Sequence, residues 1–299
     1  MRRLALLVLL LIAAGLPFGV SSYVLGVLTL AYYFGVFAMS WDLLFGFAGE
    51  VNFGPTFLIG LGAYAAGLLD NHGWPVWLDV IAGALAALVG GLLLAIPALR
   101  LRGPYFGLVT LVAVLVLQQV IVIFAGVTGG EIGLTINDVL SLDPKVNYWL
   151  AFAALVVSGV LLYAVAHSPV GLILQASGQD PIEAQALGFN VAKHKIAAFA
   201  VSALFSGVAG AMMVFYLGTA SVNTVVDIAV GVQIIIAAVL GGRRTIIGPA
   251  IGAVFLIVAA EILRPLGQLS TFVVAAIALA VILFFPDGLV GHLLDRREG

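Results

Sequence analysis

Long apolar runs alternate with short polar stretches along nearly the whole chain. A helix needs about 20 apolar residues to cross the ~30 Å hydrocarbon core of a bilayer. Eight runs come close to that length or exceed it: 4–20, 24–46, 76–98, 104–126, 148–166, 196–217, 246–264 and 270–286. Two shorter runs, 56–69 and 227–240, bring the set to about ten. Strand-type alternation is absent, so the pattern predicts an all-α fold: a polytopic transmembrane helical bundle with some short or interrupted helices, forming one domain over residues 1–299.

Composition supports a membrane environment and narrows the chemistry. Hydrophobic residues make up 63% of the chain and charged residues only 9%, whereas a soluble domain carries about 25% charge. The net charge of −2 gives no bulk electrostatic reason to expect nucleic acid. The lack of cysteine excludes disulfides and thiol catalysis. The four histidines are scattered, so we predict no catalytic residue, no metal site and no cofactor in this chain.

Charge placement predicts the topology. The first residues, MRRLALLVLLLIAAGLPFG, could pass for a secretory signal, but further spans follow at once, so we expect a retained first span. With ten spans, only Lys145 and Arg264 lie on one side of the membrane. The other ten basic residues share the opposite side, which the excess of Lys and Arg marks as cytoplasmic together with both termini. They are Arg2, Arg3, Arg100, Arg102, Lys193, Lys195, Arg243, Arg244, Arg296 and Arg297.

Two segments interrupt the helical pattern. The first, 46–64, is rich in glycine and contains Pro55; the second, 219–227, is followed by a short apolar run and then GGRRTIIGP (241–249). Broken backbone at membrane depth is tolerated only where it is buried in protein or lines a watery cavity, and breaks in both halves of a transporter indicate its pathway. Two irregular loops are the simpler alternative. Our candidate pathway residues are Glu50, Asn52, Thr128, Glu131 and Asn223.

The longest loop on the basic side contains signals for a short helix. Within 168–195, Asp180 suits the N-cap, Pro181 the first helical position, and Glu183 the reciprocal position of a capping box. Gly188 supplies a stop. A two-turn helix over 181–187 is unstable alone. It therefore packs either on a partner or on the chain's own surface.

Six segments, taken in order, resemble the permeases of branched-chain amino acid ABC importers, closest to the LivM-type branch. They cover about residues 30–291. The segments are FGFAGEVNFGPTFLIGLGAY (45–64), RLRGPYFGLVTLV (100–112), TGGEIGL (128–134), EAQALGFNVAKHKIAAFAVSALFSGVAGAM (183–212), LGGRRTIIGPAIGA (240–253) and FFPDGLVG (284–291). In this family the loop at 168–195 corresponds to the coupling loop. The residues expected to couple to an ATPase are Asp180, Pro181, Glu183, Ala184, Leu187 and Gly188.

The resemblance implies a permease subunit that moves a small polar solute, above all branched-chain or other amino acids, across a bacterial inner membrane. Its implied partners are a second permease, two ABC ATPases and a periplasmic solute-binding protein. This chain has no G-x-x-x-x-G-K-[ST] loop, so ATP and Mg²⁺ are expected on the ATPases. Departures at Glu50, Pro55 and Ile132, where the family often has other residues, leave urea and short amides open as substrates. A secondary transporter or facilitator without an ATPase is the main alternative. An intramembrane enzyme is disfavoured, because this chain lacks motifs such as HExxH.

Overall fold

The computed structural model describes residues 2–98 and 105–267, together with residues 269, 272–273, 275–276, 279–280 and 288. Most of the expected span 270–286 therefore lies outside the described residues, as do the basic residues at 100, 102, 296 and 297. The segment FFPDGLVG lies outside them except for one residue.

Helices account for nearly all of the regular structure, as predicted. The long or apolar helices are α1 (Arg2–Gly15), α2 (Ser22–Asp42), α3 (Pro55–Asp70), α4 (Val76–Ala98), α5 (Tyr105–Ile123), α7 (Pro144–Ala166), α10 (Val191–Leu217), α11 (Ile228–Gly241) and α12 (Ile247–Leu263). One short 3₁₀ turn, Leu16–Phe18, follows α1, and another, Arg264–Leu266, follows α12. The π-helical turn η2 (Leu43–Phe47) continues α2, and the π-helical turn η3 (Val222–Val226) precedes α11. Within the described chain, seven helical segments are long and apolar enough to cross a membrane, and Val8–Phe18 and Pro55–Asp70 are shorter apolar helices.

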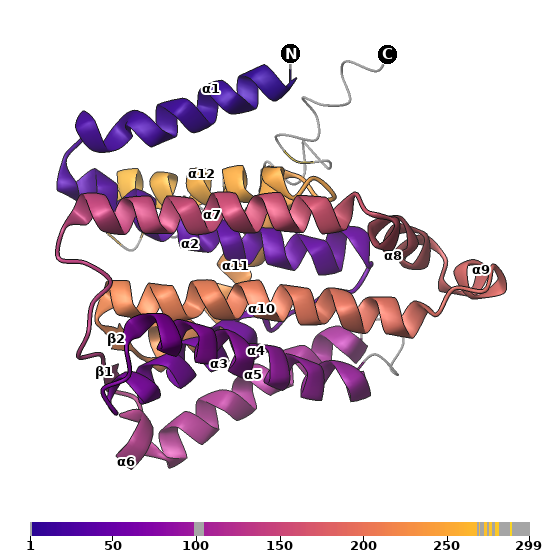
Figure 1. Cartoon of the computed structure of the whole chain (residues 1–299), viewed down its shortest axis with the longest axis horizontal. Helices are drawn as coiled ribbons and strands as arrows, with labels where there is room; N and C mark the ends of the chain where they lie inside the picture. Colours follow the sequence, from indigo (N-terminus) through magenta and orange to yellow (C-terminus); the bar gives the residue numbers. More distant parts are fainter. Residues whose placement is uncertain are drawn as a thin grey trace.

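The small elements gather at opposite ends of the bundle (Figure 1). At one end, which we call the sheet end, lie α6 (Ala125–Thr128) and the strands β1 (Leu134–Thr135) and β2 (Thr219–Ala220). These strands pair antiparallel, with Leu134 opposite Ala220. At the other end, which we call the α9 end, α8 (Pro169–Gln179) and α9 (Pro181–Ala186) project beyond the long helices.

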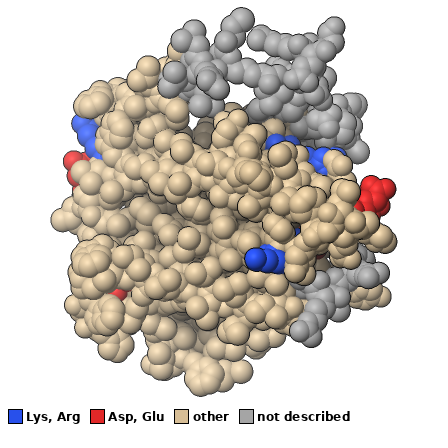
Figure 2. Space-filling model, turned by 45° about the vertical axis from the view of Figure 1, so that its right-hand side comes forward, with Lys and Arg blue, Asp and Glu red and all other residues tan. Residues whose placement is uncertain are grey.

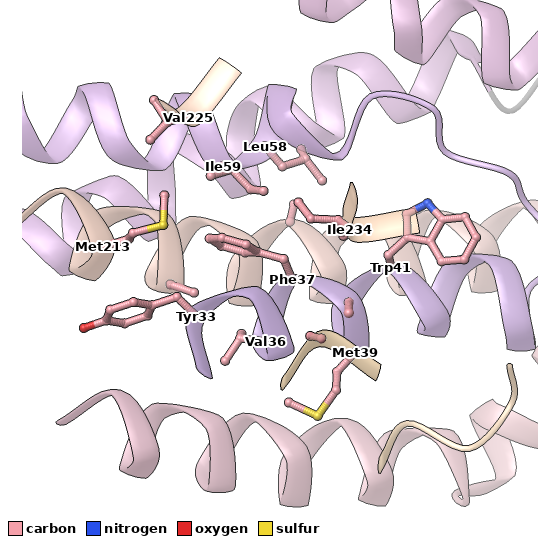
Figure 3. Close-up of a cluster of buried hydrophobic side chains, with 14 of the residues drawn as sticks. Tyr33, Val36, Phe37, Met39, Trp41, Leu58, Ile59, Met213, Val225 and Ile234 are labelled. Atoms are coloured by element: carbon pink, nitrogen blue, oxygen red, sulfur yellow. The ribbon is translucent and has the colours of Figure 1, made fainter. Parts of the chain in front are cut away.

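The core lies around α2 and α10. About two thirds (67%) of the apolar window in each of these segments is buried, compared with 28% in α4, α5 and α7. Figure 3 shows side chains from α2, α3, α10 and α11 meeting in this core, with Phe37, Ile59, Met213 and Ile234 among them. The outer helices therefore present apolar faces to their surroundings, as expected in lipid.

Small residues let α3, α4 and α10 approach backbone to backbone. A Cβ placed on Gly62 would lie 2.5 Å from the carbonyl oxygen of Gly207, and one on Gly83 would lie 2.5 Å from that of Gly62. This is the close packing that small residues four apart allow in membrane helices.

Two predicted span starts are too late, because polar caps extend the helices beyond their apolar runs. The helix expected at 148 begins at Pro144, where the Asp143 side chain accepts a hydrogen bond from Lys145 N at 2.8 Å. The helix expected at 196 begins at Val191, where Asn190 accepts one from Lys193 N at 3.0 Å. Both residues belong to types that favour the N-cap position.

The loop expected before residue 181 contains a helix that the sequence analysis missed. Ser168 caps α8, with Pro169 in its first position. The main-chain N–H of Asp180 donates to Ala176 O at 3.0 Å, so Asp180 ends α8 and caps α9 at once. Only one half of the expected capping box forms. Asp180 caps α9, but Glu183 does not bind the N–H of Asp180, because that N–H already completes the last turn of α8.

Candidate functional site

Helix α9 and the residue that follows it expose two large aliphatic side chains. Its cap forms as predicted: Asp180 Oδ1 accepts from Ile182 N at 2.8 Å and from Glu183 N at 3.0 Å, and Gly188 ends the turn with φ at +90°. Ala184 is buried against the protein, whereas Ile182 is 72% and Leu187 75% exposed. Two large aliphatic side chains are therefore exposed where the chain projects beyond the long helices.

A shallow, open depression lies next to α9. It has a volume of about 390 Å³ and is lined by Gln185, Gly188, Phe189, Asn190, Val191 and Ala192. Phe189 contributes a partly exposed ring (39%). Exposed aliphatic side chains and a shallow depression therefore occur together at the α9 end, in the segment expected to couple to an ATPase.

A buried carboxylate lies just before the first interruption. Asp42, at the end of α2, is fully buried, and its oxygens accept three main-chain hydrogen bonds from the loop between α11 and α12. The donors are Arg244 N at 2.9 Å, Thr245 N at 3.2 Å and Ile246 N at 3.0 Å. We call this arrangement the Asp42 clamp. It satisfies a buried charge that would otherwise be costly.

The clamped loop has an unusual backbone. Arg244 and Ile246 have φ angles of +63° and +58°, a region that non-glycine residues rarely adopt and that is most unfavourable for a β-branched side chain. Arg244 Nε also donates to Gly46 O in the η2 turn at 2.7 Å. The two chain halves are thus tied together at the α9 end.

Glu50 and Asn52 lie in the first interruption, and both are already engaged. Glu50 Oε1 accepts from Lys195 Nζ at 2.5 Å, and the two side chains are only 18% and 12% exposed. Asn52 is buried, and its Oδ1 accepts from Gly54 N at 2.8 Å. Its carbonyl oxygen accepts from Trp41 Nε1 at 2.7 Å. Asn52 therefore shapes the turn into α3.

The second interruption lies at the sheet end. The η3 turn exposes Asn223, and the turn is held to α5 because Gln118 Nε2 donates to Val226 O at 3.0 Å. Thr128 is buried at the end of α6, where its hydroxyl donates to Ile121 O at 2.6 Å. Glu131 is exposed on the loop that follows.

The candidate pathway residues therefore do not form one site. Glu50 and Asn52 lie toward the α9 end, whereas Thr128, Glu131 and Asn223 lie at the sheet end. A role for any of them in contacting substrate stays a prediction. Sequence reasoning missed Lys195 as the partner of Glu50 and the loop as the partner of Asp42. Among the described residues, no group of three or more acidic or histidine side chains could hold a metal ion.

These features define a multi-pass helical membrane protein with broken helices at both ends and a short helix, α9, that projects from one end. The family described as "Branched-chain amino acid transport system / permease component" matches residues 23–286, and the chain belongs to this family.

Two curated relatives extend the match to nearly the whole chain. The high-affinity branched-chain amino acid transport system permease protein LivM of Escherichia coli K12 is 25% identical over 97% of this chain and 75% of its own length. LivM of Salmonella typhimurium LT2 matches with the same identity and coverage. No solved structure matches this chain.

Proposed function

We propose that this chain is a permease subunit of an ABC importer in a bacterial inner membrane, and that it translocates a small amino acid with energy from partner ATPases. The observation that carries this proposal is α9, a capped helix that projects from the bundle with Ile182 and Leu187 exposed beside a shallow, open depression. Lipid would not select a cap of Asp180 and an acidic Glu183 at this position. A protein partner with an apolar groove accounts for both the apolar tip and its polar base.

Charge placement supports a cytoplasmic position for this docking helix. The α9 end carries Lys193, Lys195, Arg243 and Arg244, whereas Lys145 and Arg264 lie at the opposite end. Figure 2 shows how few charged side chains appear on the face it presents. Cytoplasmic ends of membrane proteins carry the excess of Lys and Arg, so the α9 end faces the cytoplasm in this proposal. The sheet end then faces a solute-binding protein.

In the proposed cycle, nucleotide-driven closure of two ATPases moves α9. ATP and Mg²⁺ bind to those ATPases, and a second permease chain completes the pathway. Because Asp180 belongs to both α8 and α9, the two helices form one corner that transmits the displacement to the bundle. The breaks at opposite ends of the bundle are placed to open alternately, as in other transporters with discontinuous helices.

The substrate class follows from the relatives. Both curated relatives are named as permeases of high-affinity branched-chain amino acid transport, and leucine, isoleucine and valine are therefore the first substrates to test. Urea and short amides are the competitors to include in the same uptake assay.

The test uses the transporter purified from membranes through a tag on this chain and reconstituted with its binding protein. Glu183→Lys reverses a charge on α9 without removing a cap bond, because Asp180 supplies the capping oxygen. We expect normal insertion and continued ATP hydrolysis, with uptake of labelled leucine lost. Glu183→Gln, which removes the charge of the same side chain and keeps its size, is the control that separates loss of the charge from its reversal.

Two results would overturn the proposal. Normal uptake by the Glu183→Lys transporter would show that α9 does not couple to an ATPase. Uptake by the purified chain alone in liposomes, driven only by a gradient, would instead make the protein a secondary transporter or facilitator.

A further inference from the structure

The cytoplasmic corner formed by α8 and α9 touches the first helix break directly. Gly178, in the last turn of α8, lies against the backbone of the break: a Cβ placed on it would come within 2.9 Å of Phe47 O and 3.0 Å of Gly49 N. Gly49 itself has a φ of +71° and would meet Gly178 in the same way. The contact is backbone against backbone, so little can yield between the two segments.

A second connection joins the same break to α10. Glu50 follows Gly49, and its carboxylate pairs with Lys195 Nζ at 2.5 Å, although the two residues are 145 positions apart. The side chains are 18% and 12% exposed. Both charges are poorly hydrated, so separating the pair would leave each of them without a compensating partner, which is costly.

Both connections lead back to α9 over short distances along the chain. Gly178 lies two residues before Asp180, which caps α9 while its N–H completes the last turn of α8. Lys195 lies in the first turns of α10, which begins at Val191 just after the stop at Gly188. A displacement of α9 thus reaches the break from its N-terminal side through α8 and from its C-terminal side through α10.

The break passes the displacement on to the other half of the chain. Just before Gly49, in the η2 turn, Gly46 O accepts a hydrogen bond from Arg244 Nε at 2.7 Å. The Asp42 clamp holds the main chain of the same loop. This loop leads into α12, so a movement of residues 46–50 would be shared with the second half of the chain.

We propose that Gly178 and Lys195 couple α9 to the first helix break, and that Glu50 is a positioning residue for this coupling and does not line the substrate pathway. This inference rests on the proposed function, because it assumes that α9 receives movement from an ATPase. It assigns Glu50 and Lys195 one shared role, which a substrate-lining role for Glu50 alone would not require.

The experiment measures uptake and ATP hydrolysis by the same reconstituted transporter. The variants are Glu50→Lys, Lys195→Glu and the double exchange Glu50→Lys/Lys195→Glu. We expect each single variant to lower leucine uptake per ATP hydrolysed by about tenfold, since each places two like charges in a poorly hydrated contact. The double exchange restores most of that ratio. The half-saturating concentration of leucine-loaded binding protein stays unchanged throughout.

A second measurement keeps the test decisive if the charge variants fold poorly. The chain contains no cysteine, so Glu50→Cys/Lys195→Cys introduces its only thiols. We expect this variant to be uncoupled, and a short thiol-reactive cross-linker that rejoins the two positions to restore uptake per ATP. A cross-linked transporter that stays uncoupled would overturn the inference.

Other outcomes separate this inference from the proposed function. If Glu50→Lys impairs uptake while Lys195→Glu does not, Glu50 acts without Lys195 and the inference fails. If both single variants transport normally while Glu183→Lys is uncoupled, the inference fails and the proposed function stands. If Glu183→Lys transports normally, the proposed function itself fails.

Discussion

The Asp42 clamp offers a sharp test of how the bundle is held together at the α9 end. The perturbation is Asp42→Asn, which keeps the size of the side chain and removes its charge. The carboxylate accepts three main-chain N–H groups, with Arg244 N on one oxygen and Thr245 N and Ile246 N on the other. An asparagine has one oxygen, so its NH₂ group faces a donor at the remaining position.

The magnitude follows from these three bonds. Hydrogen bonds to a charged group contribute about 1.5–3 kcal/mol each and neutral ones about 0.5–1.5 kcal/mol, while an unsatisfied buried N–H costs about 1–3 kcal/mol. The lower desolvation cost of a neutral amide offsets part of the loss. We expect a net destabilisation of about 2–4 kcal/mol. For a chain of this size that corresponds to a fall in apparent Tm of roughly 4–8 °C.

The assay is thermal unfolding of the purified protein in detergent, together with limited trypsin digestion. Loss of the clamp also frees Arg244 and Ile246 from their left-handed conformation, so cleavage after the exposed Arg243 and Arg244 should accelerate. Asp143→Asn is the matched control, since Asp143 is an exposed N-cap and Asn serves that position equally well. A Tm within about 1 °C of the parent protein, with unchanged cleavage, would refute the clamp as a stabilising element.

Two further predictions concern packing and the cap of α9. Gly62→Ala should lower the apparent Tm, because the new methyl group would meet the Gly207 backbone at 2.5–2.6 Å and overpacking costs about 1–3 kcal/mol. The control Gly126→Ala places its methyl group in open space and should leave the Tm unchanged. Equal Tm values for the two variants would contradict the close packing of α3 on α10. Asp180→Ala removes a cap worth about 1 kcal/mol from a six-residue helix, so uptake per ATP should fall while the Tm changes little. Asp180→Asn keeps a capping oxygen and should preserve both uptake per ATP and Tm. Equal uptake by the two variants would mean that the cap is not needed.

The sequence predicts the membrane bundle well because burial in lipid leaves a local signal. Apolar runs of span length need no knowledge of the fold, and nine of the ten expected spans coincide with described helices. The cap of α9 was predictable for the same reason, since Asp180, Pro181 and Gly188 act within one helix. Helix α8 was missed because PVGLILQASGQ mixes glycine and polar residues with a short apolar stretch.

The candidate site was less predictable because its contacts join residues far apart in the chain. Glu50 and Lys195 are 145 positions apart, and Asp42 and Ile246 are 204 positions apart. Nothing in either local segment identifies the other. Glu50 is a candidate pathway residue from its position in a break, and that role stays a prediction; what the structure adds is that its carboxylate already has a cationic partner.

The two breaks lie at opposite ends of the bundle and differ in how their free backbone groups are satisfied. Backbone polar groups at membrane depth need partners from protein or water. At the α9 end those partners are side chains, with Asp42 and Arg244 each binding main chain in the other half. At the sheet end the partners include main chain, in the β1–β2 pair, as well as side chains, because Gln118 Nε2 donates to Val226 O and Thr219 Oγ1 donates to Leu134 O. Side-chain bonds can be exchanged without unfolding the strands or helices that carry them. The side-chain bonds of Asp42 and Arg244 could therefore be exchanged during the proposed cycle, whereas exchange of the β1–β2 main-chain bonds would separate the two strands.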